Sequence, residues 1–157
     1  MPGSTSLNSA TGDQMTTIAY KDGVIAYDSR VTRGTTITDD DAEKCQVVKG
    51  VRFICTGCAC DFPALLGAYF GTAATSQVDA SGLVVDGDTL WLIGHDDTTG
   101  FWKDRLELDR SYAIGSGSTH AFTAMDMGAT AAEAVEMAKR RDTCTGGLIR
   151  TLDIKTA

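Results

Sequence analysis

Short runs of hydrophobic and polar residues, separated by turn residues, predict strands over much of the chain. Three glycine-containing turns have apolar or alternating segments on both sides, a pattern typical of β-hairpins. The expected hairpins are TTIAY and VIAYDSR around residues 21–23, CQVV and VRFICT around Lys49-Gly50, and LVV and TLWLIG around residues 86–88. Further strands are expected at TTIT (35–38), at GFWK as an edge strand, and at LIRTLDI near the end of the chain.

Three other segments have a helical period. Apolar residues recur at i, i+3, i+4, i+7 and i+8 after Asp61, which is expected to cap the first helix. Thr130 and Glu133 have the spacing of a capping box for the third helix. The expected helices cover residues 62–70, about residues 119–127, and Thr130 to about Arg141.

This order of elements, with hairpins first and helices in two blocks, predicts an α+β fold with antiparallel sheet. A chain of 157 residues suits a single domain. Residues 1–14 contain one large apolar residue and lack the pattern of a secretory signal. Residues 1–15 are therefore interpreted as a disordered leader, a propeptide or a cloning remnant ahead of a domain over residues 16–157. Alternatively, the native chain begins at Met15.

Charge and composition narrow the range of partners. A net charge of -7 argues against nucleic acid, because phosphate binding needs a basic surface. No apolar run approaches the roughly 18 residues of a membrane span, so no membrane association is expected. The HDDTTG segment that begins at His95 is expected to be an exposed polar loop.

The five cysteines predict a reducing, cytoplasmic location, because they are odd in number and accompany no export signal. The sequence CTGCAC brings Cys55, Cys58 and Cys60 together, which raises a metal site as an alternative. A tetrahedral zinc site needs four ligands, and no second pair is nearby. We therefore expect these thiols to bind no metal.

The first hairpin brings a threonine to a carboxylate in either of two registers. A three-residue loop, Lys21-Asp22-Gly23, places Thr16 opposite Asp28, whereas a two-residue Asp-Gly turn places Thr17 there. The sequence leaves both registers open.

The Met15-Thr16 junction adds a chemical possibility to this hairpin. A freed N-terminal threonine carries its own base, because an α-amine has a pKa of about 7.7–8.0 and can take the proton of the hydroxyl as the oxygen attacks a carbonyl. Such a site also needs a cation, a carboxylate that holds the cation, and N–H groups for the oxyanion.

Five segments of the chain, in order, resemble proteasome β subunits and the bacterial heat-shock-locus V peptidase. TTIAYKDGVIAYDSRVT resembles the start of the mature subunit, and the 16-residue spacing from Asp28 to Lys44 matches that between the catalytic Asp and Lys of the family. Gly57 precedes Asp61 by four residues, as the oxyanion-hole glycine of the family precedes its turn. The last two segments are AIGSGSTHAFTAMDMGATAAEAVEMA and RRDTCTGG.

The resemblance implies a role for each matching residue. Thr16 is the nucleophile and its amine is the base, and Asp28 holds Lys44 as the cation beside it. The N–H of Gly57 helps to bind the oxyanion. The resemblance also implies a hydrogen-bond network around the amine, a residue lining the specificity pocket, and a nearby cation in relatives. The network consists of Ser116, Asp142 and Thr145. Cys55 lines the pocket, and the cation would lie near residues 142–145. Removal of Lys44 is expected to abolish hydrolysis and leave the fold intact.

The implied fold is the four-layer αββα sandwich of N-terminal-nucleophile hydrolases, with two stacked antiparallel sheets. The helical layer is reduced here, because one short helix and a loop connect Asp61 to the strand at Leu83, where the family has two long helices.

The implied function is that of a threonine endopeptidase. It would hydrolyse peptides or unfolded protein through an acyl-enzyme on Thr16, without an organic cofactor, in a homo-oligomeric ring with an ATPase regulator as a further partner. Two alternatives stay open: a non-catalytic ring or scaffold subunit, and an amidohydrolase that acts on a small amide.

Overall fold

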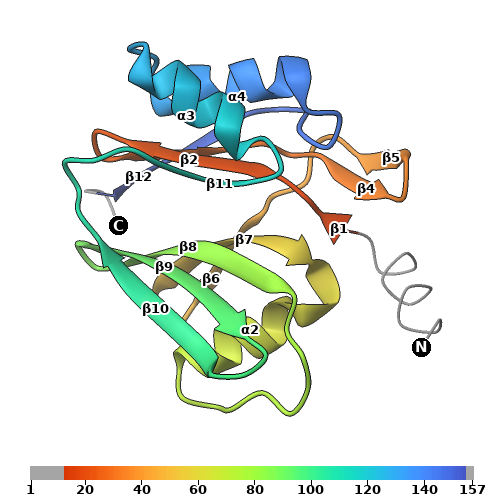
Figure 1. Ribbon diagram of the computed structural model, residues 1–157, viewed down its shortest axis with the longest axis vertical. Coiled ribbons are helices and arrows are strands. Elements are labelled where there is room, and N and C mark those ends of the chain that lie inside the picture. Colours follow the sequence, from red (N-terminus) through yellow and green to blue (C-terminus); the bar gives the residue numbers. More distant parts are fainter. Residues whose placement is uncertain (1–12, 155–157) are drawn as a thin grey trace.

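The computed structural model describes residues 13–154, in which two antiparallel sheets lie against each other (Figure 1). The smaller sheet has the strand order β11-β2-β3-β12. Its strands are β2 (Thr17–Lys21), β3 (Val24–Tyr27), β11 (Tyr112–Gly115) and β12 (Arg150–Asp153). The sheet thus joins the first hairpin to two strands from the second half of the chain.

The first hairpin has the two-residue turn. Lys21 pairs with Val24 and Ile18 pairs with Tyr27. Asp22 and Gly23 both have positive φ, 52° and 83°, as a tight Asp-Gly hairpin turn requires. One step beyond the last pair, Thr17 is opposite Asp28, so the structure selects the second of the two registers.

The larger sheet has eight strands in the described part of the chain, in the order β10-β9-β8-β7-β1-β4-β5, with β6 also paired to β7. The second and third expected hairpins are confirmed as β6–β7 and β8–β9. The strands are β1 (Asp13–Gln14), β4 (Val31–Arg33), β5 (Thr36–Asp39), β6 (Cys45–Val48), β7 (Val51–Cys58), β8 (Ala80–Asp86), β9 (Thr89–Asp96) and β10 (Gly100–Leu106). As expected, β10 is an edge strand.

Three α-helices flank the sheets within the described residues. They are α2 (Phe62–Tyr69), which follows the 3-10 turn η1 (Ala59–Asp61), α3 (Ser118–Asp126) and α4 (Ala131–Arg141). The predicted capping box at the start of α4 is confirmed, because the Thr130 hydroxyl accepts from the Glu133 N–H and the Glu133 carboxylate accepts from the Thr130 N–H. Figure 1 shows α3 and α4 on the outer face of the smaller sheet, and α2 beyond the larger sheet.

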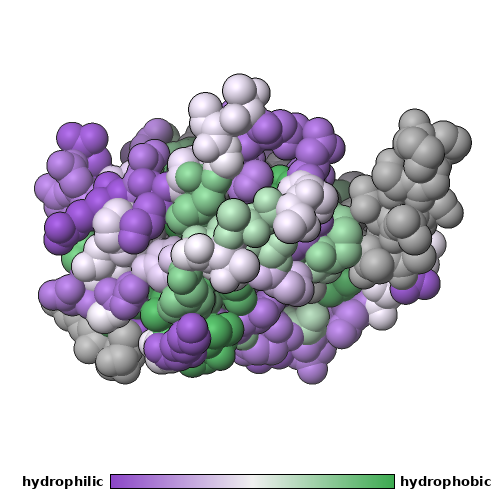
Figure 2. Space-filling model, turned by 90° about the horizontal axis from the view of Figure 1, so that it is seen from below, coloured by the Kyte–Doolittle hydropathy of each residue, from purple (hydrophilic) through white to green (hydrophobic). Residues whose placement is uncertain are grey.

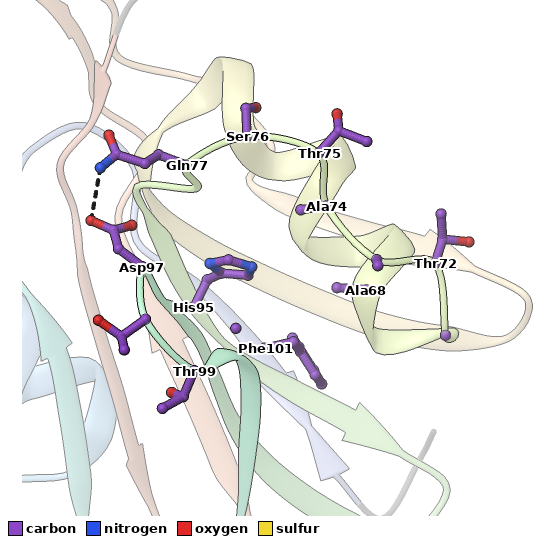
Figure 3. Close-up of a pocket in the computed structure, with 14 residues that line it drawn as sticks. Ala68, Thr72, Ala74, Thr75, Ser76, Gln77, His95, Asp97, Thr99 and Phe101 are labelled. Carbon is purple, nitrogen blue, oxygen red and sulfur yellow. Dashed lines mark hydrogen bonds between the residues drawn. The ribbon is translucent and has the colours of Figure 1, made fainter.

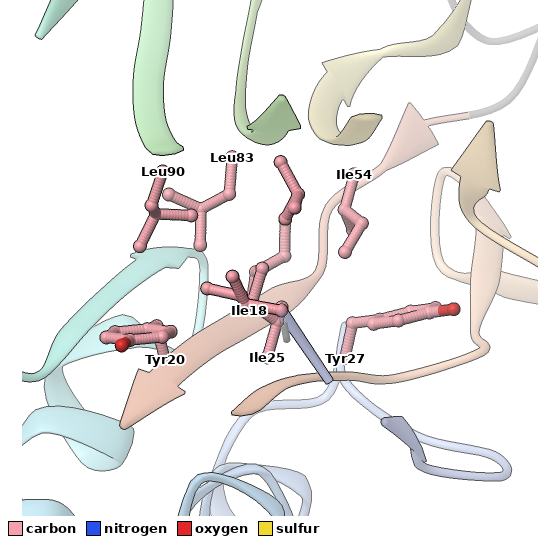
Figure 4. Packing of buried hydrophobic residues seen from close by; sticks show 9 residues of the cluster. Ile18, Tyr20, Ile25, Tyr27, Ile54, Leu83 and Leu90 are labelled. Atoms are coloured by element: carbon pink, nitrogen blue, oxygen red, sulfur yellow. The ribbon is translucent and has the colours of Figure 1, made fainter. Parts of the chain in front are cut away.

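Three hydrophobic clusters hold these elements together. Between the sheets, side chains of β2 and β3 face Ile54, Leu83 and Leu90 of the larger sheet (Figure 4). Alanines and Val135 pack α3 and α4 on the smaller sheet. Phe62, Leu65 and their neighbours pack α2 on the larger sheet. The alternation of side chains along each strand therefore decides which cluster a residue joins.

The α2 side differs from the sequence-based expectation in two details. Asp61 does not cap α2 with its side chain, because the 3-10 turn leads directly into the helix; one of its carboxylate oxygens accepts from the Asp79 N–H instead, at 2.8 Å. Strand β8 begins at Ala80, inside the segment expected to be loop, because that part of the chain pairs with β7.

Seen from below the view of Figure 1, pale and hydrophobic residues gather in the middle of the face, with hydrophilic residues around them (Figure 2).

Candidate active site

Thr16, Asp28 and Lys44 meet in the interior although they come from three different segments. Thr16 directly precedes β2, Asp28 directly follows β3, and Lys44 directly precedes β6. The Lys44 ammonium lies 2.9 Å from Oδ1 of Asp28, and the Thr16 hydroxyl donates to the same oxygen. All three residues are buried. The three residues that the resemblance linked by spacing are therefore in direct contact.

Backbone groups fix the other side of the Asp28 carboxylate. Oδ2 accepts from the Gly146 N–H at 2.8 Å, and the Arg30 N–H is 3.4 Å away. A buried carboxylate is costly unless it is paired and hydrogen-bonded, and Asp28 has both kinds of partner. The carboxylate is consequently held in one orientation toward Thr16 and Lys44.

Burial changes the electrostatics of Lys44. Removal from water lowers the pKa of its ammonium, while the charge of Asp28 and the hydrogen bond to it act in the opposite direction. The net direction is downward. Lys44 is therefore a desolvated cation whose charge depends on Asp28.

A second cluster contains Ser116, Asp142 and Thr145, as the resemblance implied. Oδ2 of Asp142 accepts from the Ser116 hydroxyl at 2.5 Å and from the Thr145 hydroxyl at 2.6 Å. Burial acts to raise the pKa of Asp142, but these two bonds and one from the Cys144 N–H outweigh it, so the pKa is lowered. The expected cation near residues 142–145 stays a prediction.

Thr17 joins the two clusters, a contact that sequence reasoning missed. Its hydroxyl lies 2.7 Å from that of Thr145, and its N–H lies 3.4 Å from the Asp28 carboxylate. The Ser116 hydroxyl lies 3.4 Å from the carbonyl oxygen of Thr16. The two-residue hairpin register, which puts Thr17 opposite Asp28, was the signal that could have found this role.

A cavity of about 440 Å³ opens beside this centre. Met15, Gly57, Ser116 and Trp102 are among the residues that line it. Gly57 has φ 118°, and a Cβ there would lie 2.5 Å from the Asp79 carbonyl oxygen, so only glycine fits. The glycine that the sequence singled out thus forms a wall of the cavity next to Thr16.

Cys55 is not among the residues that line this cavity. It is buried with Phe53 and Phe62 between the larger sheet and α2, and burial raises the pKa of its thiol to about 12. The side chain points toward α2, whereas its neighbours Thr56 and Gly57 line the cavity. The structure therefore does not bring Cys55 to Thr16.

The thiol cluster includes different residues from those expected. Within residues 13–154, Cys58, Cys60 and Asp61 have ligand atoms within 4.8 Å of one another, close enough to hold a metal ion. Cys55 lies outside this group. An oxygen of Asp61 already accepts from Asp79, and the set supplies three ligands where a closed zinc site needs four. The absence of a metal stays a prediction.

A second cavity, of about 610 Å³, lies where α2 ends and the loop leads back to β8 (Figure 3). His95 points into it from β9, so this residue is part of a strand and not of an exposed loop. Gln77 and Asp97 lie side by side at one edge of the cavity, where the Gln77 amide donates to the Asp97 carboxylate at 2.9 Å (Figure 3). This hollow occurs in the segment where the sequence has one helix fewer than the family it resembles.

None of the helices in the described part of the chain is long and apolar enough to cross a membrane.

Comparison with solved structures reveals the relationship of this fold. No family model and no curated protein matches the sequence. Thiobacillus denitrificans BPH is similar with a TM-score of 0.63 and 20% identity, over 87% of this chain and 95% of that chain. Eukaryotic HslV from Trypanosoma brucei is similar with a TM-score of 0.62 and 19% identity, over 88% of this chain and 98% of that chain. BPH in complex with epoxomicin is also similar, with a TM-score of 0.58 and 18% identity over 87% and 96% of the two chains. The chain therefore has an HslV-like proteasome β-subunit fold.

Proposed function

We propose that this protein is a threonine endopeptidase whose nucleophile is the hydroxyl of Thr16. One observation carries the proposal: the Thr16 hydroxyl and the Lys44 ammonium meet at the same buried oxygen of Asp28. A lysine that served only as a surface ion-pair residue would stay in water, whereas Lys44 is buried against a carboxylate that also binds a hydroxyl. The arrangement provides the cation and the carboxylate that an N-terminal nucleophile requires.

The proposed reaction begins when cleavage before Thr16 frees its amine. In the structure Thr16 follows Met15, so its nitrogen is an amide and cannot yet serve as a base. Once free, the amine takes the hydroxyl proton while the oxygen attacks the scissile carbonyl. Lys44 stabilises the developing negative charge on the Thr16 oxygen, and the Gly57 N–H is the proposed donor to the oxyanion.

The tetrahedral intermediate then collapses. The carbon–nitrogen bond of the substrate breaks, the leaving amine receives the proton from the Thr16 amine, and an ester to the Thr16 oxygen remains. Water, activated by the same amine, hydrolyses the ester and restores the hydroxyl. Asp28 holds Lys44 throughout. On the opposite side of Thr16, Ser116, Asp142 and Thr145 form a hydrogen-bonded network, and Ser116 links it to the carbonyl oxygen of Thr16.

The strand β1 favours a peptide over a small amide as the substrate. Asp13 pairs with Cys58 of β7 and with Thr32 of β4, and Gln14 pairs with Gly57. An extended segment is therefore accommodated between β7 and β4, directly beside the cavity. Peptide recognition by addition of a strand uses this kind of opening.

The fold is consistent with the four-layer αββα arrangement of N-terminal-nucleophile hydrolases, and we propose that this chain has it. We also propose a homo-oligomer, and an ATPase regulator as a partner, by analogy with the ring-forming family. Light scattering that gives the mass of one chain, 16.6 kDa, at micromolar concentration would contradict the oligomer.

The test combines mass spectrometry with labelling. We expect the active protein to begin at Thr16, and epoxomicin, which is bound by BPH in one similar structure, to bind the processed wild type but not its Thr16→Ala variant. A Thr17→Ser variant, which keeps a hydroxyl near Thr145, is the matched control and should still be labelled. Hydrolysis by a chain that retains residues 1–15 would contradict the free-amine mechanism. Absence of labelling and of hydrolysis in a chain that begins at Thr16 would favour the non-catalytic scaffold.

A further inference from the structure

Trp102 occupies an unusual position at the wall of the cavity beside Thr16. It pairs with Gly94 across β9 and β10, and a Cβ at Gly94 would lie 2.3 Å from Cζ2 of the indole. Glycine is thus the only residue that lets the ring rest on the backbone of β9. The residue keeps 37% of its surface exposed and lines the cavity, so its ring is accessible from there.

The alternation of the strands places this indole on the inner face of the larger sheet. Leu106, four residues further along β10, packs in the cluster between the two sheets. Phe101 and Trp91, on the other face, pack toward α2. Trp102 therefore lies on the inner face of the larger sheet and lines the same cavity as Met15, the residue directly before Thr16.

Met15 shows which part of a substrate would reach Trp102. It directly precedes Thr16 and lines the same cavity, with 39% of its surface exposed. The volume of about 440 Å³ remains beside it, so the methionine does not fill the space. A peptide that follows the path of residues 13–15 would place the residue before its scissile amide where Met15 lies.

We propose that Trp102 determines substrate specificity, by selecting peptides with a bulky apolar residue, aromatic above all, directly before the scissile amide. This inference rests on the proposed function. The indole offers a face on which another ring stacks or packs edge to face. Asp79, a residue of the same charge sign, is also among the residues that line the cavity, so an acidic side chain at this position is disfavoured.

The first experiment compares four fluorogenic peptide amides that differ only in the residue before the scissile amide: Phe, Met, Ala or Asp. The protein is expressed from Met15, so that it begins at Thr16 after removal of the methionine. We expect kcat/KM in the order Phe, Met, Ala, Asp, with Phe over Ala by about tenfold or more. In Trp102→Ala the ratio of Phe to Ala should fall to about threefold or less, and Trp102→Leu should lose the preference for Phe over Met.

The control is Trp91→Phe, which alters an aromatic residue of β9 on the opposite face, under Lys103. It should keep the full preference for Phe. An unchanged ratio of Phe to Ala in both Trp102 variants, with hydrolysis intact, would overturn the role of Trp102 and leave the proposed function standing.

A second measurement does not need catalysis. Calorimetry on the Thr16→Ala protein, expressed in the same way, gives the Kd of peptides that end in Phe or in Ala at the cleaved position. We expect the Phe peptide to bind about tenfold more tightly, and the Trp102→Ala change to remove this difference. If this holds while the Thr16 protein hydrolyses nothing, the proposed function fails and the binding role of Trp102 stands. Equal binding of both peptides by the Thr16→Ala protein would overturn that role.

Discussion

Asp28 and Asp142 lie on opposite sides of the same threonine pair, yet their environments differ in kind. Asp28 is fully buried and shares one oxygen between an ammonium and a hydroxyl. Asp142 is partly exposed, and its carboxylate accepts from two hydroxyls and one backbone N–H. The first carboxylate holds a charge next to the hydroxyl of Thr16, the proposed nucleophile, whereas the second accepts from neutral groups. The difference teaches that Asp28 depends on a directly bonded opposite charge, whereas Asp142 is held mainly by neutral donors.

The largest expected effect comes from removing that opposite charge. Lys44→Ala should lower the single-turnover acylation rate of Thr16 by on the order of 10² to 10³, because a preorganised charge at the developing alkoxide is lost. Lys44→Arg should restore little, since a planar guanidinium does not replace a compact ammonium in a tight site. Acylation by an activated peptide measures both. Lys49→Ala, in the exposed β6–β7 turn, is the control and should acylate normally.

Removal of the Lys44 charge should also destabilise the protein, while the expectation from sequence that the fold stays intact remains a prediction. Lys44 is buried, and its removal leaves the Asp28 carboxylate buried without its cation, at a cost of about 3–5 kcal/mol. Urea denaturation of Lys44→Met should show this loss. The double variant Asp28→Asn, Lys44→Met should recover much of the stability and none of the activity. Equal stability of the single and double variants would show that the pair is not coupled.

The stability of the protein at acidic pH should report on the hydrogen bonds that the Asp142 carboxylate accepts. Its folded-state pKa is lowered, so its contribution to stability is present above the unfolded pKa, about 3.9, and is lost as the pH falls through the lower folded value. Unfolding free energies measured from pH 6 to pH 3 should therefore fall less steeply below about pH 4 in Asp142→Asn than in wild type. Asp88→Asn, in the exposed β8–β9 turn, is the matched control. Identical acid slopes for wild type and Asp142→Asn would contradict the network.

The smallest expected effect lies outside both clusters. Thr130→Ala removes the capping box of α4 and should cost about 1 kcal/mol of stability, because the Glu133 N–H loses its acceptor. The acylation rate should stay within about twofold of wild type, since Thr130 lies at the opposite end of α4 from Asp142. Thr130→Ser keeps the acceptor and serves as the control. A large loss of activity in Thr130→Ala would mean that α4 positions the Asp142 cluster more directly than the contacts indicate.

The sequence predicted most local structure, because short-range chemistry decides it. The glycine turns of the three hairpins, the edge strand at Gly100 and the capping box at Thr130 all depend on residues near one another in the chain. Some elements that depend on distant partners were missed, although the last strand, which pairs with β3, was expected. Strand β11 is only four residues long, and it forms because Tyr112–Gly115 pairs with β2, far away in the sequence.

Thr16, Asp28 and Lys44 could be selected from the sequence by residue type and spacing. The reason is that an N-terminal nucleophile needs a carboxylate and a cation, and the resembling family has them at the same spacing. Tertiary structure alone decided that the hydroxyl of Thr16 reaches Asp28 while that of Thr17 reaches Thr145, and that Lys44 is buried rather than exposed. It also turned Cys55 toward α2 and placed Trp102 at the cavity beside Thr16. The physical reason is that one step along a strand reverses the face of a side chain, and only the pairing of distant strands fixes which face looks toward the site.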